Sequence, residues 1–254
     1  MERGWSWSAM PTSSPSVGPG QVLRDLVDSE QIPVARLQRI YRQVQDSGVV
    51  LNAHRVLQGK SLVSAHDNPE LRKDFFLIPR PHSAPMIQQT LLKVVGERMT
   101  ALGFDPAHDV QVLAPMRNGP LGILTLNRLL QDLLNPSGET LQLGEKRLRV
   151  GDRVIQTRND YELDVFNGDI GRVTGLDGRS LKVQFDDRSL TLAGEQLDAL
   201  ELAYAMTIHK SQGSEYPAVV VVLASSHSIM LKRNLLYTAL TRAQQFCCLI
   251  GDER

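Results

Sequence analysis

The sequence has few cysteines and no long apolar run near its start, and both absences narrow the class of protein. Its 254 residues include two cysteines, Cys247 and Cys248, which are neighbours in a strand-like segment. Adjacent cysteines cannot form an ordinary structural disulfide framework, so we expect packed, apolar side chains in a reducing cytosol. No N-terminal segment is apolar for long enough to be a signal peptide or an anchor. We therefore expect a cytoplasmic protein with no membrane partner.

The sequence also lacks an excess of charge of either sign. Lys and Arg together number 28, Asp and Glu together number 28, and the formal net charge is zero. Nucleic-acid-binding proteins are usually basic overall, so any such contact must come from a local patch or a groove. With 42% hydrophobic residues, a chain of this length can bury one substantial core and a small second one.

A polar cluster near the C-terminal end stands directly before an apolar run. The run, residues 218–223, is typical of a strand buried on both faces of a parallel sheet. Gly213 lets a backbone N–H approach a ligand, the nearby donors suit a phosphate, and Glu215 could accept a ribose hydroxyl. Since α/β sheets bind ligands at strand ends, we expect a nucleotide or phosphate site here. The cluster consists of Thr207, His209, Lys210, Ser211, Gln212, Gly213 and Glu215.

A second stretch, residues 234–251, predicts a helix followed by another buried strand. Apolar residues recur at helical spacing up to Ala243, and residues 246–250 read as the strand. Arg242 at the helix end could bind a phosphate bidentately and offset charge in a phosphoryl-transfer transition state. From this stretch alone, a solvated arginine at a helix end is equally consistent.

The region from residue 74 to residue 136 has an α/β pattern. Strands are expected at 74–78 and 109–115, and amphipathic helices at 86–102 and 121–134. Arg117 and Asn118 lie in the glycine-containing loop after the second of these strands. They could contact a DNA phosphate, although an ordinary strand-to-helix turn would also explain them.

From about residue 138 to residue 198 the pattern changes to short strands with tight turns. Asp177-Gly178 and Asp186-Asp187 are expected to form hairpin turns, and the whole segment is typical of a small β-barrel. Tyr161 or Phe166 in its first long loop could stack on a base. For Phe166, however, filling the core of the barrel is the favoured role.

The two C-terminal stretches, TIHKSQGSEYP and LLYTALTRAQQFCCLIG, resemble motifs V and VI of superfamily 1 helicases. The wording KSQGSEYP is similar to the RecD-like DNA helicases, and further similarity covers residues 15–27, 40–56, 110–136 and 151–173. The resemblance implies an α/β fold, in which a RecA-like parallel sheet flanked by helices carries an inserted SH3-like β-barrel. Residues 15–137 and 199–254 would form the RecA-like domain, and residues 138–198 the barrel.

The resemblance also implies roles for individual residues. Arg242, and Arg42 from the motif IV region, would be catalytic arginines at the γ-phosphate of ATP, which binds with Mg²⁺. Without the resemblance, Arg42 is better interpreted as a helix-start arginine that pairs with Asp46. The nucleotide would also be bound by Gln212, Gly213 and Glu215. The implied contacts to single-stranded DNA are Thr207, His209, Lys210, Arg117, Asn118, Asn159 and Tyr161.

No Gly-x-x-x-x-Gly-Lys-Ser/Thr loop occurs in the sequence, and no Asp-Glu pair precedes Pro15 to hold magnesium. In superfamily 1 helicases those parts belong to the first of two RecA-like domains, so the resemblance covers the second domain. It begins abruptly at Pro15, and we expect residues 1–14 to be the atypical, disordered start of a truncated chain.

Two hypotheses follow for the function. The chain is the second motor domain of an ATP-dependent 5′–3′ DNA helicase, completed by an N-terminal RecA-like domain in cis or in trans. Alternatively, it is a catalytically inactive fragment that at most binds single-stranded DNA. A relaxase-linked helicase is a further candidate origin for the same motifs.

Overall fold

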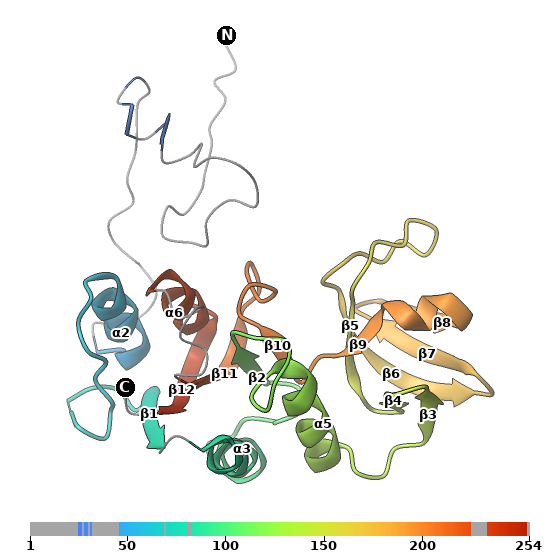
Figure 1. The fold of residues 1–254 in the computed structure, drawn as a ribbon, viewed down its shortest axis with the longest axis horizontal. Helices are drawn as coiled ribbons and strands as arrows, with labels where there is room; N and C mark the ends of the chain where they lie inside the picture. Colours follow the sequence, from blue (N-terminus) through green and yellow to red (C-terminus); the bar gives the residue numbers. More distant parts are fainter. Residues whose placement is uncertain are drawn as a thin grey trace.

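The computed structural model describes residues 46–68, 70–80, 83–224 and 233–252, together with residues 25, 26, 28, 29 and 31. Arg42 and residues 1–14 lie outside this part of the chain. The described residues form a parallel sheet covered by helices, with an antiparallel barrel beside it (Figure 1). None of the described helices is both long enough and apolar enough to cross a membrane.

The larger domain is built on a five-stranded parallel sheet with the strand order β1-β12-β11-β2-β10. All five residues of β2 are buried, and so are all residues of β11 except Pro217. Burial on both faces explains why these strands are continuously apolar rather than alternating. The strands are β1 (Phe75–Arg80), β2 (Val110–Ala114), β10 (Ala205–Thr207), β11 (Tyr216–Leu223) and β12 (Ala243–Asp252).

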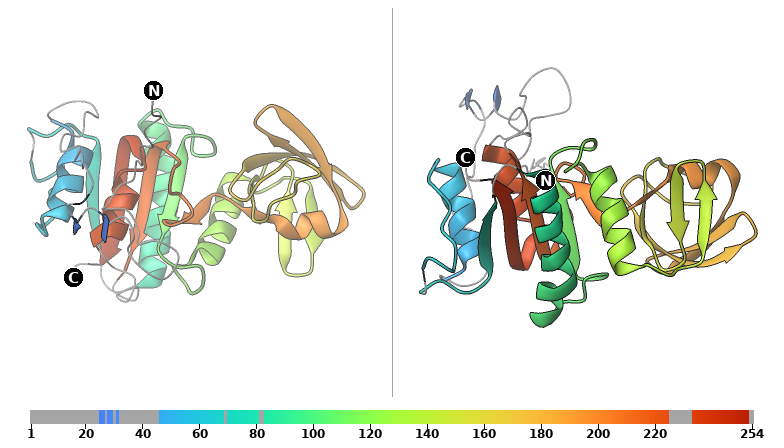
Figure 2. Two further views of the ribbon diagram at one scale, coloured as in Figure 1. Left: turned by 90° about the horizontal axis from the view of Figure 1, so that it is seen from above. Right: turned by 60° about the horizontal axis from the view of Figure 1, so that its bottom comes forward.

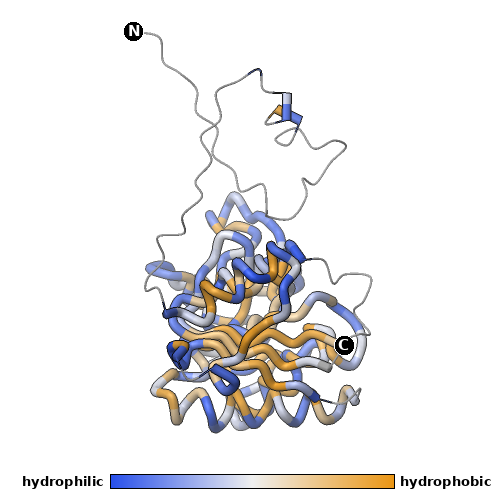
Figure 3. Tube along the Cα trace, turned by 90° about the vertical axis from the view of Figure 1, so that its left-hand side faces the viewer, coloured by the Kyte–Doolittle hydropathy of each residue, from blue (hydrophilic) through white to orange (hydrophobic). Residues whose placement is uncertain are grey.

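Helices cover both faces of this sheet (Figures 1 and 2). Helices α3 (Ala84–Lys93) and α5 (Ile123–Leu134) share one apolar core with Val220 and Val222 of β11. Helices α2 (Gly48–Leu57) and α6 (Arg233–Leu240) share the other with Val219 and Val221. The strands thus form the apolar centre of the domain (Figure 3).

The long helix predicted at 86–102 is one continuous segment with a change of hydrogen bonding in its middle. It runs from α3 through a π-helical turn, Val94–Arg98, to α4 (Met99–Ala101). The backbone N–H of Met99 donates to the carbonyl of Val94, the i to i+5 bond that defines a π-turn. Gly103 follows at a φ of 87°, which glycine adopts readily, and ends the segment.

The adjacent cysteines are packed as predicted. Cys247 belongs to the core under α2 and α6, and Cys248 to the core under α3 and α5, because successive strand residues point to opposite faces. Burial raises the pKa of the Cys248 thiol to about 12 and that of Cys247 well above its usual value. Both thiols are therefore protonated, unreactive core groups.

The smaller domain is an antiparallel sheet with the strand order β8-β7-β6-β5-β9, accompanied by the hairpin β3-β4. Both predicted hairpin turns are present, at Asp177-Gly178 between β6 and β7 and at Asp186-Asp187 between β7 and β8. A 3-10 helix, Gly194–Ala199, precedes the last strand. The strands are β3 (Thr140–Leu143), β4 (Lys146–Arg149), β5 (Arg153–Gln156), β6 (Ile170–Asp177), β7 (Ser180–Phe185), β8 (Arg188–Leu192) and β9 (Leu200–Leu202).

The prediction that Phe166 fills the barrel core is wrong. Phe166 is 39% exposed, whereas the preceding residue, Val165, is 1% exposed and belongs to the barrel core. Val165 pairs with Asp160 in a short bridge, so the chain is extended here and neighbouring side chains point to opposite sides. An offset of one residue thus places the ring of Phe166 on the surface, where it packs edge-on against Tyr161.

A buried carboxylate joins the barrel to helix α5. Asp152 is fully buried, and one of its oxygens accepts hydrogen bonds from the Gln131 side chain (2.5 Å) and the Arg149 backbone N–H (2.7 Å). Its other oxygen accepts from the Asn135 side chain (2.8 Å) and the Tyr204 hydroxyl (3.0 Å). Four donors therefore satisfy one charge at the junction of the two domains.

Candidate nucleotide and nucleic-acid sites

Residues 208–215, the loop between β10 and β11, carry most of the predicted site. The loop leaves β10 beside Ala114, the last residue of β2, and enters β11 before Ala218, which pairs with Val110 at the start of β2. Since all three strands are parallel, the loop leads from the carboxyl edge of the sheet to its amino edge. The position expected from the sequence, at a carboxyl end, therefore holds for Thr207 but not for Gln212, Gly213 and Glu215, which stand before β11.

The loop is wound into successive turns that hold its backbone. The Thr207 hydroxyl accepts the N–H of Lys210 (3.2 Å), and the buried Ser211 hydroxyl donates to the carbonyl of Ile208 (2.8 Å). Gly213 has a φ of 85°, a conformation that side chains other than glycine adopt with strain. The polar side chains that remain exposed on this loop are those of His209, Gln212 and Glu215.

Arg242 is packed against the amino-edge part of this loop. Its guanidinium donates to the carbonyls of Ser214 (2.8 Å) and Thr238 (3.1 Å) and to the Thr241 hydroxyl (3.2 Å). The residue is only 9% exposed, so the alternative of a solvated arginine at a helix end is wrong. The backbone N–H of Tyr216 also donates to the carbonyl of Arg242 (2.9 Å). Arg242 thus lies beside the segment that contains Gly213 and Glu215.

Arg117 lies at the opposite, carboxyl edge, where it forms a two-pronged ion pair with Glu201. Its Nη1 and Nη2 atoms donate to the two carboxylate oxygens at 2.9 and 2.7 Å. Glu201 belongs to β9 of the barrel, so the pair spans the two domains. The Arg117 guanidinium holds the pKa of the Glu201 carboxyl below its usual value, and this carboxyl is charged at neutral pH.

Two lysines stand near the same carboxylate. Burial lowers the pKa of Lys210, and the charge of Glu201 opposes that effect. Burial also lowers the pKa of Lys146, whose ammonium donates to the carbonyls of Leu197 (3.0 Å) and Asp198 (3.1 Å). Three cations, Arg117, Lys146 and Lys210, therefore gather around one acid. The sequence analysis missed Lys146 and Glu201, because each belongs to a barrel strand whose position beside the sheet no local pattern reveals.

The loop that carries Arg117 and Asn118 has a backbone that comes very close to Gly122. A Cβ atom at Gly122 would lie 2.3 Å from the carbonyl oxygen of Asn118 and 2.6 Å from that of Arg117. Such distances are well inside van der Waals contact, so only glycine fits here. Asn118 itself is exposed, next to Arg117.

Asn159 and Tyr161 lie on the long loop between β5 and β6, which projects from the barrel (Figure 1). The Asn159 side chain donates to the Tyr161 hydroxyl (3.2 Å) and accepts the N–H of Asn167 (2.9 Å). Tyr161 is 79% exposed, and its ring centroid lies 6.0 Å from that of Phe166. These residues form an exposed aromatic pair on the barrel rather than part of the sheet edge.

The predicted residues thus form three groups. Gln212, Gly213, Glu215 and Arg242 lie at the amino edge of β11 and β12. Among the described residues, no cluster of three or more His, Cys, Asp or Glu side chains could hold a metal ion. The carboxyl-edge group consists of Thr207, Lys210, Arg117 and Asn118, with His209 on the loop between the edges, and the barrel group consists of Asn159 and Tyr161.

Comparison with known proteins identifies both domains. Residues 126–185 match the family model of the ATP-dependent RecD-like DNA helicase SH3 domain, and residues 202–250 match that of the UvrD-like helicase C-terminal domain. The ATP-dependent RecD2 DNA helicase of Deinococcus radiodurans is 37% identical over 216 residues, which are 85% of this chain and 28% of that protein. The RecBCD enzyme subunit RecD of Mycobacterium tuberculosis is 34% identical over 253 residues, 94% of this chain and 43% of that subunit.

The chain therefore spans less than half the length of these two curated relatives. Among solved structures, the Pif1 helicase from Bacteroides in complex with ADP-AlF3 and single-stranded DNA superposes with a TM-score of 0.50 at 17% identity. The match covers 85% of this chain and 51% of that one. At this identity the likeness shows the fold, a RecA-like sheet flanked by helices.

Proposed function

We propose that this chain, which belongs with the RecD-like helicases as their C-terminal region, forms the second motor domain of an ATP-dependent 5′–3′ DNA helicase. One observation carries the proposal. The loop of residues 208–215 has the cationic cluster of Arg117 and Lys210 at its first end and Arg242 at its last. A single rigid loop could therefore transmit a change at a nucleotide to a bound DNA strand.

The amino edge suits the phosphates of ATP. Arg242 is already oriented by three hydrogen bonds, and such an arginine can stabilise the charge that develops in phosphoryl transfer. Gln212, Gly213 and Glu215 would bind other parts of the nucleotide, and Arg42 would join from the motif IV region. Bound ATP with Mg²⁺ would supply the phosphoryl group. The P-loop and the acids that hold Mg²⁺ would come from a first RecA-like domain, in cis or in trans.

The carboxyl edge suits a single strand of DNA. Arg117 and Lys210 would bind its phosphates, with Thr207, His209 and Asn118 as polar contacts. The exposed pair of Tyr161 and Phe166, next to Asn159, would offer bases a surface on which to stack. Phosphate binding at Arg117 would compete with Glu201 for the guanidinium.

The alternative is that the chain only binds single-stranded DNA and catalyses nothing. The absence of a P-loop from the sequence favours it for this chain acting alone. ATP hydrolysis by the chain, measured with and without single-stranded DNA, separates the two when the N-terminal RecA-like domain of a RecD-like helicase is added. DNA-stimulated turnover in the mixture alone supports a motor half, whereas DNA binding without turnover in either supports the alternative.

The sharpest residue-level test is Arg242→Lys in this reconstituted motor. We expect ATP turnover to fall by about a thousandfold, because a lysine keeps the charge but cannot reproduce the fork of a guanidinium. Arg233→Lys, an exposed position on the same helix, is the matched control and should leave turnover unchanged. Turnover of the Arg242 variant equal to that of the control would remove Arg242 from the transition state.

A further inference from the structure

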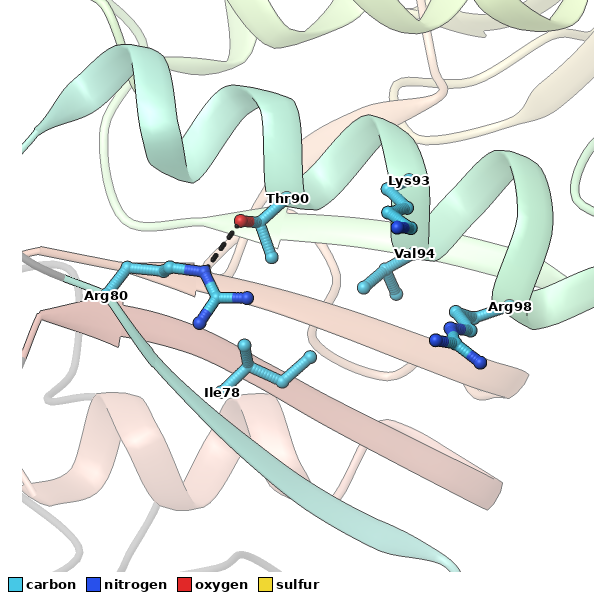
Figure 4. Close-up of a pocket in the computed structure, with 6 residues that line it drawn as sticks. All are labelled: Ile78, Arg80, Thr90, Lys93, Val94 and Arg98. Atoms are coloured by element: carbon cyan, nitrogen blue, oxygen red, sulfur yellow. Dashed lines mark hydrogen bonds between the residues drawn. The ribbon is translucent and has the colours of Figure 1, made fainter.

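A groove at the far edge of the sheet has no role in the proposed motor. It is a cavity of about 210 Å³ between the edge strand β1 and the helical segment that begins with α3 (Figure 4). Strand β1 lies at the opposite edge from β10, next to which the proposed DNA contacts stand. The groove is lined by Ile78, Arg80, Thr90, Lys93, Val94 and Arg98.

Three of these six residues are cations, and one of them is held in place. The Nε atom of Arg80 donates to the Thr90 hydroxyl (2.9 Å), and its Nη1 atom donates to the carbonyl of Pro79 (2.9 Å). Within the part of the chain that the structure describes, no carboxylate comes within 4 Å of Arg80, Lys93 or Arg98. The acid nearest to them in sequence, Glu97, lines a neighbouring groove instead. The positive charge is therefore unneutralised.

The π-turn helps to align these cations. In a regular α-helix, Arg98 would stand about 80° around the axis from Thr90, because each residue turns the chain by about 100°. The i to i+5 bonding of Val94–Arg98 puts more residues into one turn and so reduces this offset. Thr90, Lys93, Val94 and Arg98 consequently line one groove. A π-turn is an uncommon feature that often marks a functional position.

The spacing of the cations indicates the kind of ligand. Thr90 and Arg98 are eight residues apart, so the row extends about 12 Å along the helix axis. Successive phosphates of one strand in a DNA duplex are about 3.4 Å apart along the axis, so such a row can meet more than one phosphate. The floor of the groove is formed by the side chains of Ile78 and Val94, which cannot read a base by hydrogen bonding. Binding would rest on charge.

We propose that the groove lined by Arg80, Thr90, Lys93 and Arg98 is a second anion site, which binds a row of consecutive phosphate groups. Arg80, fixed by Thr90, holds one end of the row, and Arg98 holds the other. Lys93 stands between them (Figure 4). The phosphates can come from a nucleic-acid backbone or from a free polyphosphate chain, since both present the same repeating charge.

The test is calorimetric titration of the full chain with inorganic tripolyphosphate at low salt. We expect the double variant Lys93→Gln/Arg98→Gln to bind at least tenfold more weakly than the unsubstituted chain, because two of the three cations are lost. Both side chains are exposed, so the fold should tolerate the change, which a thermal melt verifies. Arg179→Gln, an exposed arginine in a barrel turn, is the control for general loss of charge. Equal affinity of the double variant and the control, or no binding by the unsubstituted chain, would overturn the site.

A second titration with a twelve-residue oligothymidine distinguishes the two sources. If the ligand is a nucleic-acid backbone, the double variant also weakens oligonucleotide binding and reduces the dependence of its logarithm on salt by one to two phosphate contacts, about 0.7 per contact. If only tripolyphosphate binding falls, the site exists and its ligand is a free polyphosphate. Neither outcome depends on ATP turnover or on Arg117, so the site and the proposed motor function fail or stand separately.

Discussion

At the scale of single residues, Glu201 determines how much positive charge the carboxyl edge can offer a ligand. It accepts both prongs of the Arg117 guanidinium and also attracts Lys210 and Lys146. The ion pair is half exposed on the arginine side, with 53% of that side chain accessible, and exposed pairs contribute at most about 1 kcal/mol. A phosphate can therefore take Arg117 from Glu201 at small cost.

We predict that Glu201→Gln strengthens the binding of single-stranded DNA by about two- to fivefold. The neutral amide no longer competes for Arg117, and the three cations then face the strand without a nearby negative charge. Fluorescence anisotropy across a salt series measures both the affinity and its salt dependence, which should become steeper.

Glu195→Gln is the control for this experiment, because it removes the same charge from an exposed position one turn before Glu201 in the chain. If both variants bind DNA equally, the carboxyl edge is not where the strand lies.

What the sequence reveals about single residues depends on whether their partners are local. Arg242 follows from a motif, and its contacts to Thr238 and Thr241 lie within four residues. Glu201 and Arg117 are 84 residues apart, and no pattern in the sequence links them. Phe166 was assigned to the core because aromatic rings usually fill small barrels, yet the phase of a short extended segment placed Val165 there instead.

At the scale of elements, the loop between β2 and α5 depends on Gly122 for its shape. Ile123 N–H donates to the carbonyl of Met116, and Leu124 N–H to that of Arg117, so the loop folds back onto the start of the helix. The carbonyls of Arg117 and Asn118 come too close to Gly122 to allow a Cβ atom. Arg117 thus points at Glu201 because the residue at 122 has no side chain.

We predict that Gly122→Ala weakens single-stranded DNA binding about as much as Arg117→Gln does. The methyl group would collide with backbone atoms, which cannot move aside as the tip of a side chain can, so the loop must shift and Arg117 must leave its position. Anisotropy measures the affinity, and loss of the Arg117–Glu201 contact can be checked by solving the structure of the variant.

Gly175→Ala is a suitable comparison, since a Cβ atom at Gly175 would make ordinary contacts, the nearest at 3.6 Å. DNA binding by Gly122→Ala that equals binding by this control would show that the loop does not position a DNA contact.

Elements could be predicted from the sequence where burial makes them periodic. The continuous apolar run of β11, the spacing of α5 and the turns of the barrel all correspond to predicted elements. The direction of the loop at 208–215 could not be read, because it depends on which strands lie beside β10 and β11. That order, with β2 between them, is a property of the sheet rather than of either segment.

At the scale of the whole molecule, two apolar cores are joined by polar contacts. The sheet domain and the barrel have separate clusters of buried residues, although Leu202 packs against both. Arg153 and Arg172 of the barrel donate to the carbonyls of Val110 (3.3 Å) and Ala107 (3.3 Å) at the amino edge of β2. Arg153 also lies over the ring of Tyr216, with its Cζ atom 5.7 Å from the centroid. The relative placement of the domains thus depends on hydrogen-bonded groups.

Asp152 is the most buried of these groups, and its removal tests whether the molecule unfolds as one unit. We predict that calorimetry of the unsubstituted chain shows one transition, and that Asp152→Ala shows two, with the barrel unfolding first. Four donors, on Gln131, Asn135, Tyr204 and the Arg149 backbone, would lose their acceptor, which costs about 3 kcal/mol or more at the domain junction. The sheet core does not contact this carboxylate and should keep its own melting temperature. Glu139→Ala, an exposed acid beside the barrel, should still give one transition, and a single transition for Asp152→Ala would mean that the apolar contacts of Leu202 and its neighbours couple the domains without the buried carboxylate.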